Sequence, residues 1–164
     1  MSISEATGNE QFLTFKLGEE IFAVEVARVR EILDVTTITK VPQTPEYMRG
    51  VINLRGGVVP VIDLRLRFGM SGTENTVNTC IIVVEVNVGG ERVVLGTLAD
   101  SVQEVFDLEA GQIEPPPRIG ARLNTEFLKG MGKHQDGFVI ILDIDNLFTS
   151  SDLQQLQVLE DRAA

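Results

Sequence analysis

The stretch Gly57-Val58-Val59-Pro60-Val61-Ile62-Asp63-Leu64 decides the fold, because a closely similar stretch occurs again later in the chain. Eighty residues further on, the sequence reads Gly137-Phe138-Val139-Ile140-Ile141-Leu142-Asp143-Ile144. At the same spacing, Glu46-Tyr47-Met48-Arg49-Gly50 matches Glu126-Phe127-Leu128-Lys129-Gly130. Self-similarity at a fixed period indicates repeated structural units. The sequence therefore predicts two related units, about 12–69 and 80–148, and leaves open whether strands are exchanged between them.

A second repeat has a different spacing. Val29-Arg30-Glu31-Ile32 matches Val102-Gln103-Glu104-Val105, which begins 73 residues later. The larger spacing seen after these stretches implies a longer connection in the second unit, and the extra length falls around 110–122. A polar loop, 70–78, separates the two units. We expect a flexible tail over 1–11, a domain over 12–148 and a C-terminal helix or tail over 149–164.

The composition favours a mainly β protein. The chain contains 20 Val and 13 Ile against 8 Ala, and β-branched side chains pack well on a pleated sheet. Many short strands punctuated by Gly and Pro argue for barrels or a sandwich. Three helical segments are expected: a turn over Val26–Leu33, a short helix over Thr44–Gly50 and a longer one over Ser151–Arg162. The expected strands are Gln11–Leu17, Ile21–Val26, Val51–Leu54, Val58–Asp63, Cys80–Val88, Glu91–Leu98, Ser101–Phe106 and Phe138–Leu142.

Charge and hydropathy exclude several classes of protein. The formal net charge is −10, whereas proteins that bind duplex nucleic acid cluster Lys and Arg against the phosphates. The longest run of consecutive apolar residues, Cys80–Val84, is far shorter than the roughly 20 residues that a membrane-spanning helix needs. The polar N-terminal stretch lacks the pattern of a secretory signal, and Cys80 is the only cysteine. We expect a cytoplasmic protein with no direct membrane insertion.

Catalytic and metal-binding groupings are sparse. His134 is the only histidine and lies in a polar turn, so a zinc site is not indicated. Cys80 opens an apolar strand and is interpreted as a buried small hydrophobe. Asp63 and Asp143 occupy equivalent positions in the repeat, which favours a shared structural role over a pair of catalytic carboxylates. That pair remains the enzymatic alternative, and a large separation between the carboxylates would exclude it. No cofactor, metal or catalytic residue is predicted.

Several longer motifs resemble the CheW family of chemotaxis coupling proteins. The most specific are Gly50-Val51-Ile52-Asn53-Leu54-Arg55-Gly56 and Val59-Pro60-Val61-Ile62-Asp63-Leu64-Arg65. Phe15-Lys16-Leu17-Gly18, Val29-Arg30-Glu31-Ile32 and the Pro115-Pro116-Pro117 loop also match. The likeness runs from about residue 12 to residue 148. It implies two SH3-like five-stranded β-barrels packed around a shared core, with short helical turns and a C-terminal helix.

The resemblance also implies a function. Members of this family are non-catalytic adaptors that join the cytoplasmic tips of chemoreceptors to the histidine kinase CheA, through its regulatory domain. The same type of coupler also serves arrays that control pili or biofilm, and that alternative stays open. Because the surfaces suit unlike partners, we expect a monomer when the protein is isolated, with no nucleic acid bound.

The resemblance assigns the contact residues to two sets. Opposite charges at Glu31 and Arg55 suit an ion pair that links the two binding surfaces, and rigid-body adjustment between the barrels near this pair is expected to carry the signal. The receptor set is Val29, Glu31, Ile32, Arg55, Gly96, Val102 and Val105. The kinase set is Gly50, Asn53, Gly56, Glu114, Arg118 and Ile119.

Overall fold

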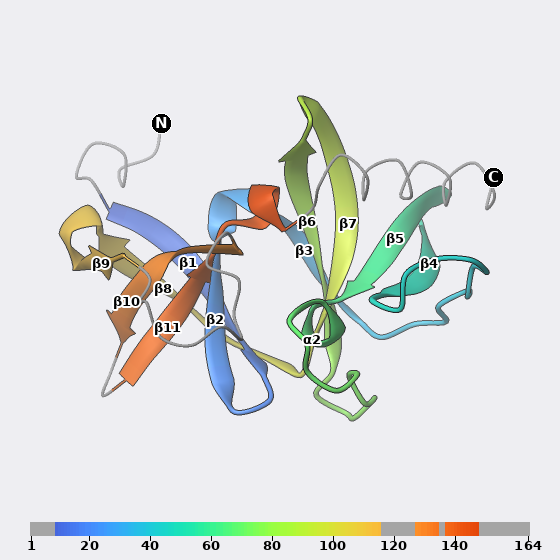
Figure 1. Ribbon diagram of the computed structural model, residues 1–164, viewed down its shortest axis with the longest axis horizontal. Helices are drawn as coiled ribbons and strands as arrows, with labels where there is room; N and C mark the ends of the chain where they lie inside the picture. The colour runs from blue at the N-terminus through green and yellow to red at the C-terminus, as the bar shows by residue number, and fades with distance from the viewer. Residues whose placement is uncertain (1–8, 116–126, 135–136, 148–164) are drawn as a thin grey trace.

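The structure is a computed structural model that describes residues 9–115, 127–134 and 137–147 (Figure 1). Its strands are β1 (Asn9–Leu17), β2 (Glu20–Glu25), β3 (Val29–Asp34), β4 (Met48–Leu54), β5 (Gly57–Asp63), β6 (Cys80–Val88), β7 (Glu91–Ala99), β8 (Ser101–Glu109), β9 (Ile113–Glu114), β10 (Leu128–His134) and β11 (Gly137–Leu142). Short helical segments are η1 (Val26–Arg28), α2 (Leu64–Arg67), η2 (Ala110–Gln112) and η4 (Ile144–Asn146). The expectation of a mainly β protein is confirmed.

The strands form two curled sheets that lie side by side (Figure 1). The first barrel is a six-stranded sheet with the order β8-β1-β2-β11-β10-β9, in which β9 contributes only two residues. The second barrel is a five-stranded sheet with the order β3-β6-β7-β5-β4. The two-barrel architecture therefore agrees with the expected fold, apart from the additional short strand in the first barrel.

Each barrel takes strands from both sides of the 70–78 loop. The first barrel joins β1 and β2 to β8–β11, and the second joins β3, β4 and β5 to β6 and β7. Strands are thus exchanged between the units 12–69 and 80–148. The exchange is completed by two parallel pairings, β11 with β2 and β5 with β7, whereas every other pairing between the described strands is antiparallel.

The repeated sequence folds into two equivalent hairpins, β4–β5 and β10–β11. In β4–β5 the register runs from Met48↔Ile62 to Gly50↔Val61, so the pairing is irregular by one residue. The register of β10–β11 shifts in the same way between Leu128↔Leu142 and Gly130↔Ile141. The Asp63 amide donates to the Tyr47 carbonyl oxygen at 2.7 Å, and the Asp143 amide donates to that of Phe127 at 2.9 Å. The spacing of 80 residues therefore has a structural basis.

The apolar side chains form three buried clusters. One lies between the barrels and includes Phe15, Phe22, Ile62, Leu64 and Ile82. The other two fill the individual barrels: one is formed by residues of β4, β5, β6 and β7, and the other by residues of β1, β2, β8 and β11. Since the first cluster draws on both sheets, it is the shared core that the resemblance implied.

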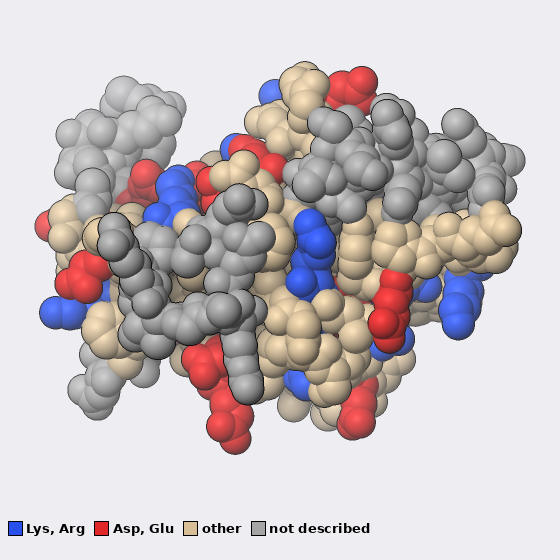
Figure 2. Space-filling view, in the orientation of Figure 1, with Lys and Arg blue, Asp and Glu red and all other residues tan. Residues whose placement is uncertain are grey.

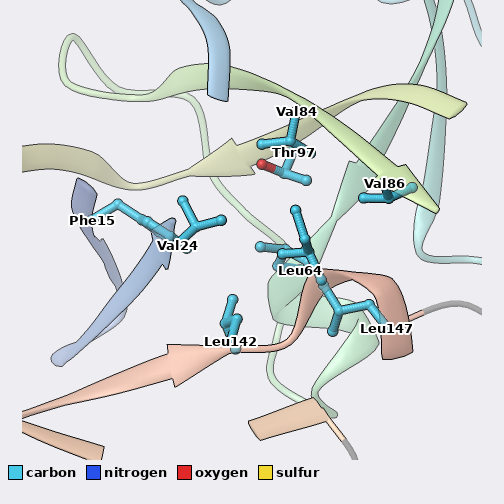
Figure 3. Close-up of a pocket in the computed structure, with 9 residues that line it drawn as sticks. Phe15, Val24, Leu64, Val84, Val86, Thr97, Leu142 and Leu147 are labelled. Carbon is cyan, nitrogen blue, oxygen red and sulfur yellow. The ribbon is translucent and has the colours of Figure 1, made fainter. Parts of the chain in front are cut away.

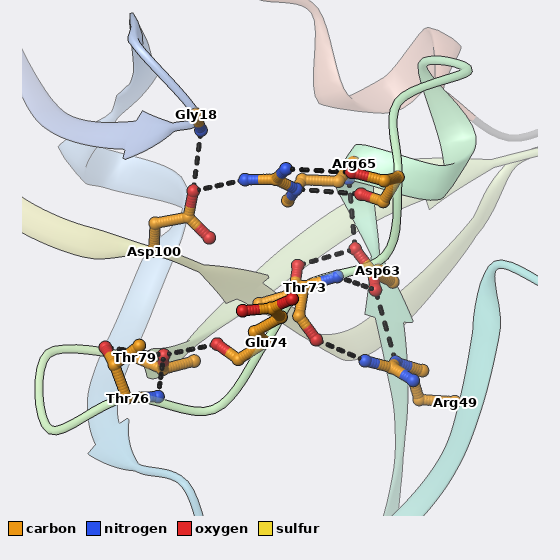
Figure 4. A network of polar contacts seen from close by, with 10 residues as sticks. Gly18, Arg49, Asp63, Arg65, Thr73, Glu74, Thr76, Thr79 and Asp100 are labelled. Atoms are coloured by element: carbon orange, nitrogen blue, oxygen red, sulfur yellow. Dashed lines mark hydrogen bonds and ion pairs between the residues drawn. The ribbon is translucent and has the colours of Figure 1, made fainter.

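Two ionic clamps join the barrels beside this core. Arg28 makes a bidentate contact with Asp145 at 2.6 and 2.8 Å, and Asp145 also accepts a hydrogen bond from the Asn87 amide. On another side, Asp100 accepts hydrogen bonds from Arg65 and from the Gly18 amide, each at 2.6 Å (Figure 4). Asp145 and Gly18 belong to segments next to strands of the first barrel, and Asn87 and Arg65 to segments of the second.

Three helical expectations are corrected or lie elsewhere. The helical turn expected over Val26–Leu33 ends at Arg28, and the chain continues as β3. The short helix expected over Thr44–Gly50 is wrong: the Met48 amide closes a turn on the Pro45 carbonyl oxygen, and β4 begins at Met48. The helix expected over Ser151–Arg162, and the segment 149–164 that contains it, lie outside the described residues, as do residues 1–8.

Candidate functional site

A β-bulge in β3 brings two apolar side chains onto one face of the strand. Val29 lies opposite Val84 and Glu31 lies opposite Val83, so Arg30 is an extra residue in the pairing. Ile32 then lies opposite Ile82. Directly opposed residues of paired strands share a face, and Val84 and Ile82 both belong to the shared core. Val29 and Ile32 therefore face the shared core although they are three residues apart.

A matching bulge occurs in β8. Leu13 lies opposite Val105 and Phe15 opposite Val102, so two β8 residues face the single residue Thr14. The buried Thr14 hydroxyl donates to the Glu104 carbonyl oxygen at 2.9 Å and accepts from the Glu104 amide at 3.0 Å. This one side chain satisfies the backbone groups that the bulge removes from the ladder. As a result, Val102 and Val105 also share one face.

These four side chains form a surface that we call the apolar strip: Val29, Ile32, Val102 and Val105. Val29 and Val102 are half-buried against the shared core, whereas Ile32 and Val105 are 45% and 51% exposed. Both strands lie at an edge of their sheet. The strip thus carries the shared core outward to solvent on both barrels.

The first residue of β6 lies between the two halves of the strip. Cys80 pairs with Asp34 on β3 and hydrogen-bonds to the backbone of Val102 on β8. Burial raises the pKa of the Cys80 thiol, and the nearby Asp34 carboxylate adds to that increase. The thiol is therefore a neutral packing group that holds the two edges near each other, as the sequence interpretation of Cys80 expected.

Glu31 and Arg55 form the expected ion pair. Arg55 Nη1 and Nη2 donate to Glu31 Oε2 and Oε1 at 2.6 and 2.9 Å. These hydrogen bonds lower the pKa of Glu31 and raise that of Arg55. Both residues belong to the second barrel, where β3 and β4 are the two outer strands of the sheet. The pair therefore connects the edges of one barrel, which corrects the expectation that it links two separate surfaces.

The turn that presents Arg55 is built from residues with unusual backbone angles. Arg55 and Gly56 have φ values of 52° and 82°, the left-handed values that two-residue hairpin turns require. The Asn53 side-chain oxygen accepts a hydrogen bond from the Gly56 amide at 3.0 Å. The guanidinium is thus held at the hairpin tip by the chain on both sides of it.

The remaining residues of the two predicted sets are distributed over both barrels. Gly96 is buried, and a Cβ atom there would lie 2.7 Å from Ile81 Cγ2. Its role in this structure is close packing inside the second barrel. Gly50 is buried as well, whereas Asn53 and Gly56 are exposed at the β4–β5 tip. Glu114 is exposed on β9 of the first barrel. Arg118 and Ile119 lie outside the described residues.

Asp63 has a structural role. Its carboxylate is fully buried and accepts hydrogen bonds from the Arg65 amide and from both the amide and the hydroxyl of Thr73 (Figure 4). Arg49 Nε lies 3.2 Å away. Asp143, at the end of β11, accepts a hydrogen bond from the Asn146 side chain. Each carboxylate organises the loop after its own strand, one in each barrel, and the described residues include no cluster suited to a metal ion.

An apolar pocket lies between the barrels, away from the strip (Figure 3). Phe15 and Leu142 of the first barrel face Val84, Val86 and Thr97 of the second across it. All of these side chains are buried, and the Thr97 hydroxyl donates to the Ile82 carbonyl oxygen. The pocket is therefore an internal feature of the shared core, and the exposed apolar strip is the surface available to a partner.

Charged side chains are interspersed on the face drawn in Figure 2, with no broad basic patch over the described residues. Together with the net charge of −10, this arrangement lacks the cationic surface that phosphate backbones require. Among the described residues, no helix is long and apolar enough to cross a membrane.

Two curled sheets around a shared core, with an apolar strip on their edge strands, define a β-barrel domain of the adaptor class. A family model described as "CheW-like domain" matches residues 11–152. Chemotaxis protein CheW of Klebsiella aerogenes is 38% identical over 147 residues, which cover 90% of this chain and 86% of the relative. Protein FrzA of Myxococcus xanthus is 31% identical over 128 residues, 78% of this chain and 77% of the relative.

A solved structure gives the same result. The crystal structure of the scaffolding protein TtCheW from Thermoanaerobacter tengcongensis matches with a TM-score of 0.75 and 36% identity, covering 85% of this chain and 87% of that one. The chain belongs to the CheW-like domain family. Members of this family are non-catalytic scaffolds of chemotaxis arrays, so the protein is an adaptor and the enzymatic alternative is excluded.

Proposed function

We propose that this protein couples the cytoplasmic tips of chemoreceptors to the histidine kinase CheA, at the cytoplasmic face of a membrane-anchored array. The observation that carries the proposal is the apolar strip, where Ile32 and Val105 are exposed on the same face as the shared core. Receptor tips are helical hairpins in the family that the chain resembles, and an amphipathic helix binds by laying its apolar face against such a surface.

The strip suits a weak contact. Burying an exposed Val or Ile side chain contributes roughly 1.5–3 kcal/mol, and only Ile32 and Val105 retain a large exposed fraction. After the cost of association is subtracted, two such contacts support about micromolar affinity at most. An array joins many such contacts at once, so avidity compensates for the weakness of each.

The kinase contact is proposed for the ends of the barrels. Asn53 and Gly56 are exposed at the β4–β5 tip of the second barrel, and Glu114 is exposed on β9 of the first. Arg118 and Ile119 complete this proposed set. The family resemblance supports association with the kinase regulatory domain barrel to barrel, which leaves the apolar strip available to the receptor.

Co-sedimentation tests the receptor contact. Receptor signalling fragments are assembled on lipid vesicles, and retention of the adaptor is measured with and without the kinase regulatory domain. Ile32→Asp and Val105→Asp are each expected to reduce retention at least tenfold, because a charge on the strip opposes burial. Val29→Asp is a poorer choice, since Val29 packs against the shared core and its loss also lowers stability.

Phe138→Asp is the matched control. Phe138 is 52% exposed, but it lies on β11, three positions along the sheet from β8. This variant is expected to be retained like the wild type. Equal retention of Ile32→Asp, Val105→Asp and the wild type, with all proteins folded, would contradict the proposal.

A further inference from the structure

The repeat that builds the apolar strip continues into two acidic residues. Val29-x-x-Ile32-x-Asp34 on β3 corresponds to Val102-x-x-Val105-x-Asp107 on β8, with a spacing of 73 residues throughout. Asp34 lies opposite Cys80, and Asp107 lies opposite Gln11. Because side chains alternate along a strand, Asp34 shares the face of Ile32 and Asp107 shares the face of Val105. Each half of the strip therefore ends in a carboxylate.

Neither carboxylate is neutralised within the described part of the chain. Asp34 and Asp107 are exposed, and no ion pair or hydrogen bond joins either side chain to another described residue. Other acids reinforce them: β8 also carries the exposed Glu104 and Glu109 and has no basic residue. The bases nearest in sequence on β3 and at the β4–β5 tip are already engaged, Arg30 near Glu85 at 3.8 Å and Arg55 with Glu31.

We infer that the helical segment docking on the apolar strip carries basic residues beside its apolar stripe, one directed toward Asp34 and one toward Asp107. This inference rests on the proposed function and adds the chemistry of the partner. A like-charged helix is repelled from the strip and a basic one is attracted, so the pair of carboxylates provides selectivity and a faster encounter more than affinity.

Acidic residues on edge strands have a second use, because charges there prevent pairing with another sheet. The two roles differ in their response to charge reversal. Lysine protects an edge strand as well as aspartate does, so protection alone predicts no loss of partner binding when both aspartates become lysine. A complementary basic partner predicts a large loss.

The test measures binding of a receptor signalling fragment, presented as a helical hairpin, at about 25, 150 and 500 mM NaCl, a range over which the screening length falls to a few ångströms. At the lowest salt, the double variant Asp34→Asn/Asp107→Asn is expected to bind about tenfold more weakly than the wild type, roughly threefold for each exposed pair lost. The double variant Asp34→Lys/Asp107→Lys is expected to bind more weakly still, and the differences shrink at high salt. A fragment whose flanking Lys and Arg are changed to Glu is expected to restore binding to the lysine variant.

Glu19→Lys/Glu20→Lys is the matched control, because it makes the same change in net charge at the exposed β1–β2 turn. It is expected to bind like the wild type. If the asparagine and lysine variants bind as the wild type does while Ile32→Asp does not bind, the inference about basic residues is overturned and the proposed function stands. If Ile32→Asp also binds normally, the proposed function itself fails.

Discussion

At Gly50 the fold leaves no room for a side chain. The residue has φ of +144°, and a Cβ atom would lie 2.1 Å from the Thr39 carbonyl oxygen. That oxygen accepts the Val51 amide, and the Thr39 amide donates to the Val51 carbonyl oxygen, so the backbone approach is fixed from both sides. Gly130 occupies the equivalent position in the other hairpin, with its Cβ site 2.6 Å from the Glu114 carbonyl oxygen. The sequence motif around Gly50 is therefore explained by barrel closure.

Gly50→Ala is expected to lower the free energy of unfolding by about 3 kcal/mol or more, because the substitution combines a backbone clash with a strained φ. Gly90→Ala is the comparison, since Gly90 also has a positive φ of +84° but its Cβ site is open. It is expected to cost only about 1–2 kcal/mol. Urea denaturation of both variants measures the difference, and equal costs would contradict the steric explanation.

The Glu31–Arg55 pair is exposed, and its value lies in geometry more than in stability. Reversing either charge places like charges on the two edges of the second barrel and displaces the Arg55 turn from β3. Glu31→Arg and Arg55→Glu are each expected to reduce receptor-dependent kinase activation several-fold. The double variant, which restores opposite charges, is expected to recover most of it. Kinase activation in reconstituted receptor arrays measures this, and a double variant no better than the single ones would refute a role for the pair.

At the scale of elements, the strands with many β-branched residues were predictable and the bulged strand was not. Cys80–Val88 is predicted and observed with identical bounds, because its apolar side chains leave little choice. β3 was taken for a helical turn, since the bulge at Arg30 puts Val29 and Ile32 on one face at a spacing of three. β10 contains Gly130, Gly132 and Lys133 and has no β-branched residue. Its identity as a strand comes from pairing with β11, which composition alone does not reveal.

Thr14 connects the bulge of β8 to the apolar strip. Thr14→Val removes the hydroxyl that serves both the amide and the carbonyl oxygen of Glu104. Because Thr14 is buried, the cost is expected to be about 1–3 kcal/mol. Loss of the bulge also turns Val105 away from the face of Val102, so binding to the receptor fragment is expected to fall several-fold.

Thr97→Val is the control for that prediction. Its buried hydroxyl donates a single hydrogen bond, to the Ile82 carbonyl oxygen, and lies in the shared core rather than near a bulge. We expect a comparable loss of stability with unchanged receptor binding, measured by thermal unfolding and by titration of the fragment. If both variants lost binding equally, destabilisation rather than the bulge would account for the effect.

At the scale of the whole molecule, exchanged strands and a shared core make the two barrels one body. The chain crosses between them after β2, after β5, after β7 and at the parallel pairings, and the Arg28–Asp145 and Arg65–Asp100 clamps add contacts on two sides. This connectivity does not favour the expected hinge between the barrels. We expect a movement of the receptor to displace the adaptor as a unit. The clamps pair residues 117 and 35 positions apart, distances in sequence at which periodicity carries no information.

The clamp at Asp145 makes the union of the barrels sensitive to acid. Burial raises the pKa of Asp145, but hydrogen bonds from Arg28 and the Asn87 amide outweigh it, so the pKa lies below its usual value. A carboxyl group whose folded pKa is depressed stabilises the fold fully above its unfolded pKa of about 3.9, and that stabilisation is lost as the pH falls through the folded pKa.

Asp145→Asn is therefore expected to lower the free energy of unfolding by about 2 kcal/mol at pH 7, because hydrogen bonds to a charged group are lost. The gap between variant and wild type is expected to narrow as the pH falls below about 4, where the wild-type carboxylate also becomes neutral. Urea denaturation at a series of pH values measures both. Asp107→Asn provides the control, since Asp107 is exposed and its removal is expected to change stability little at any pH. A gap that stayed constant down to strongly acidic pH would show that the charge of Asp145 is not what holds the barrels together.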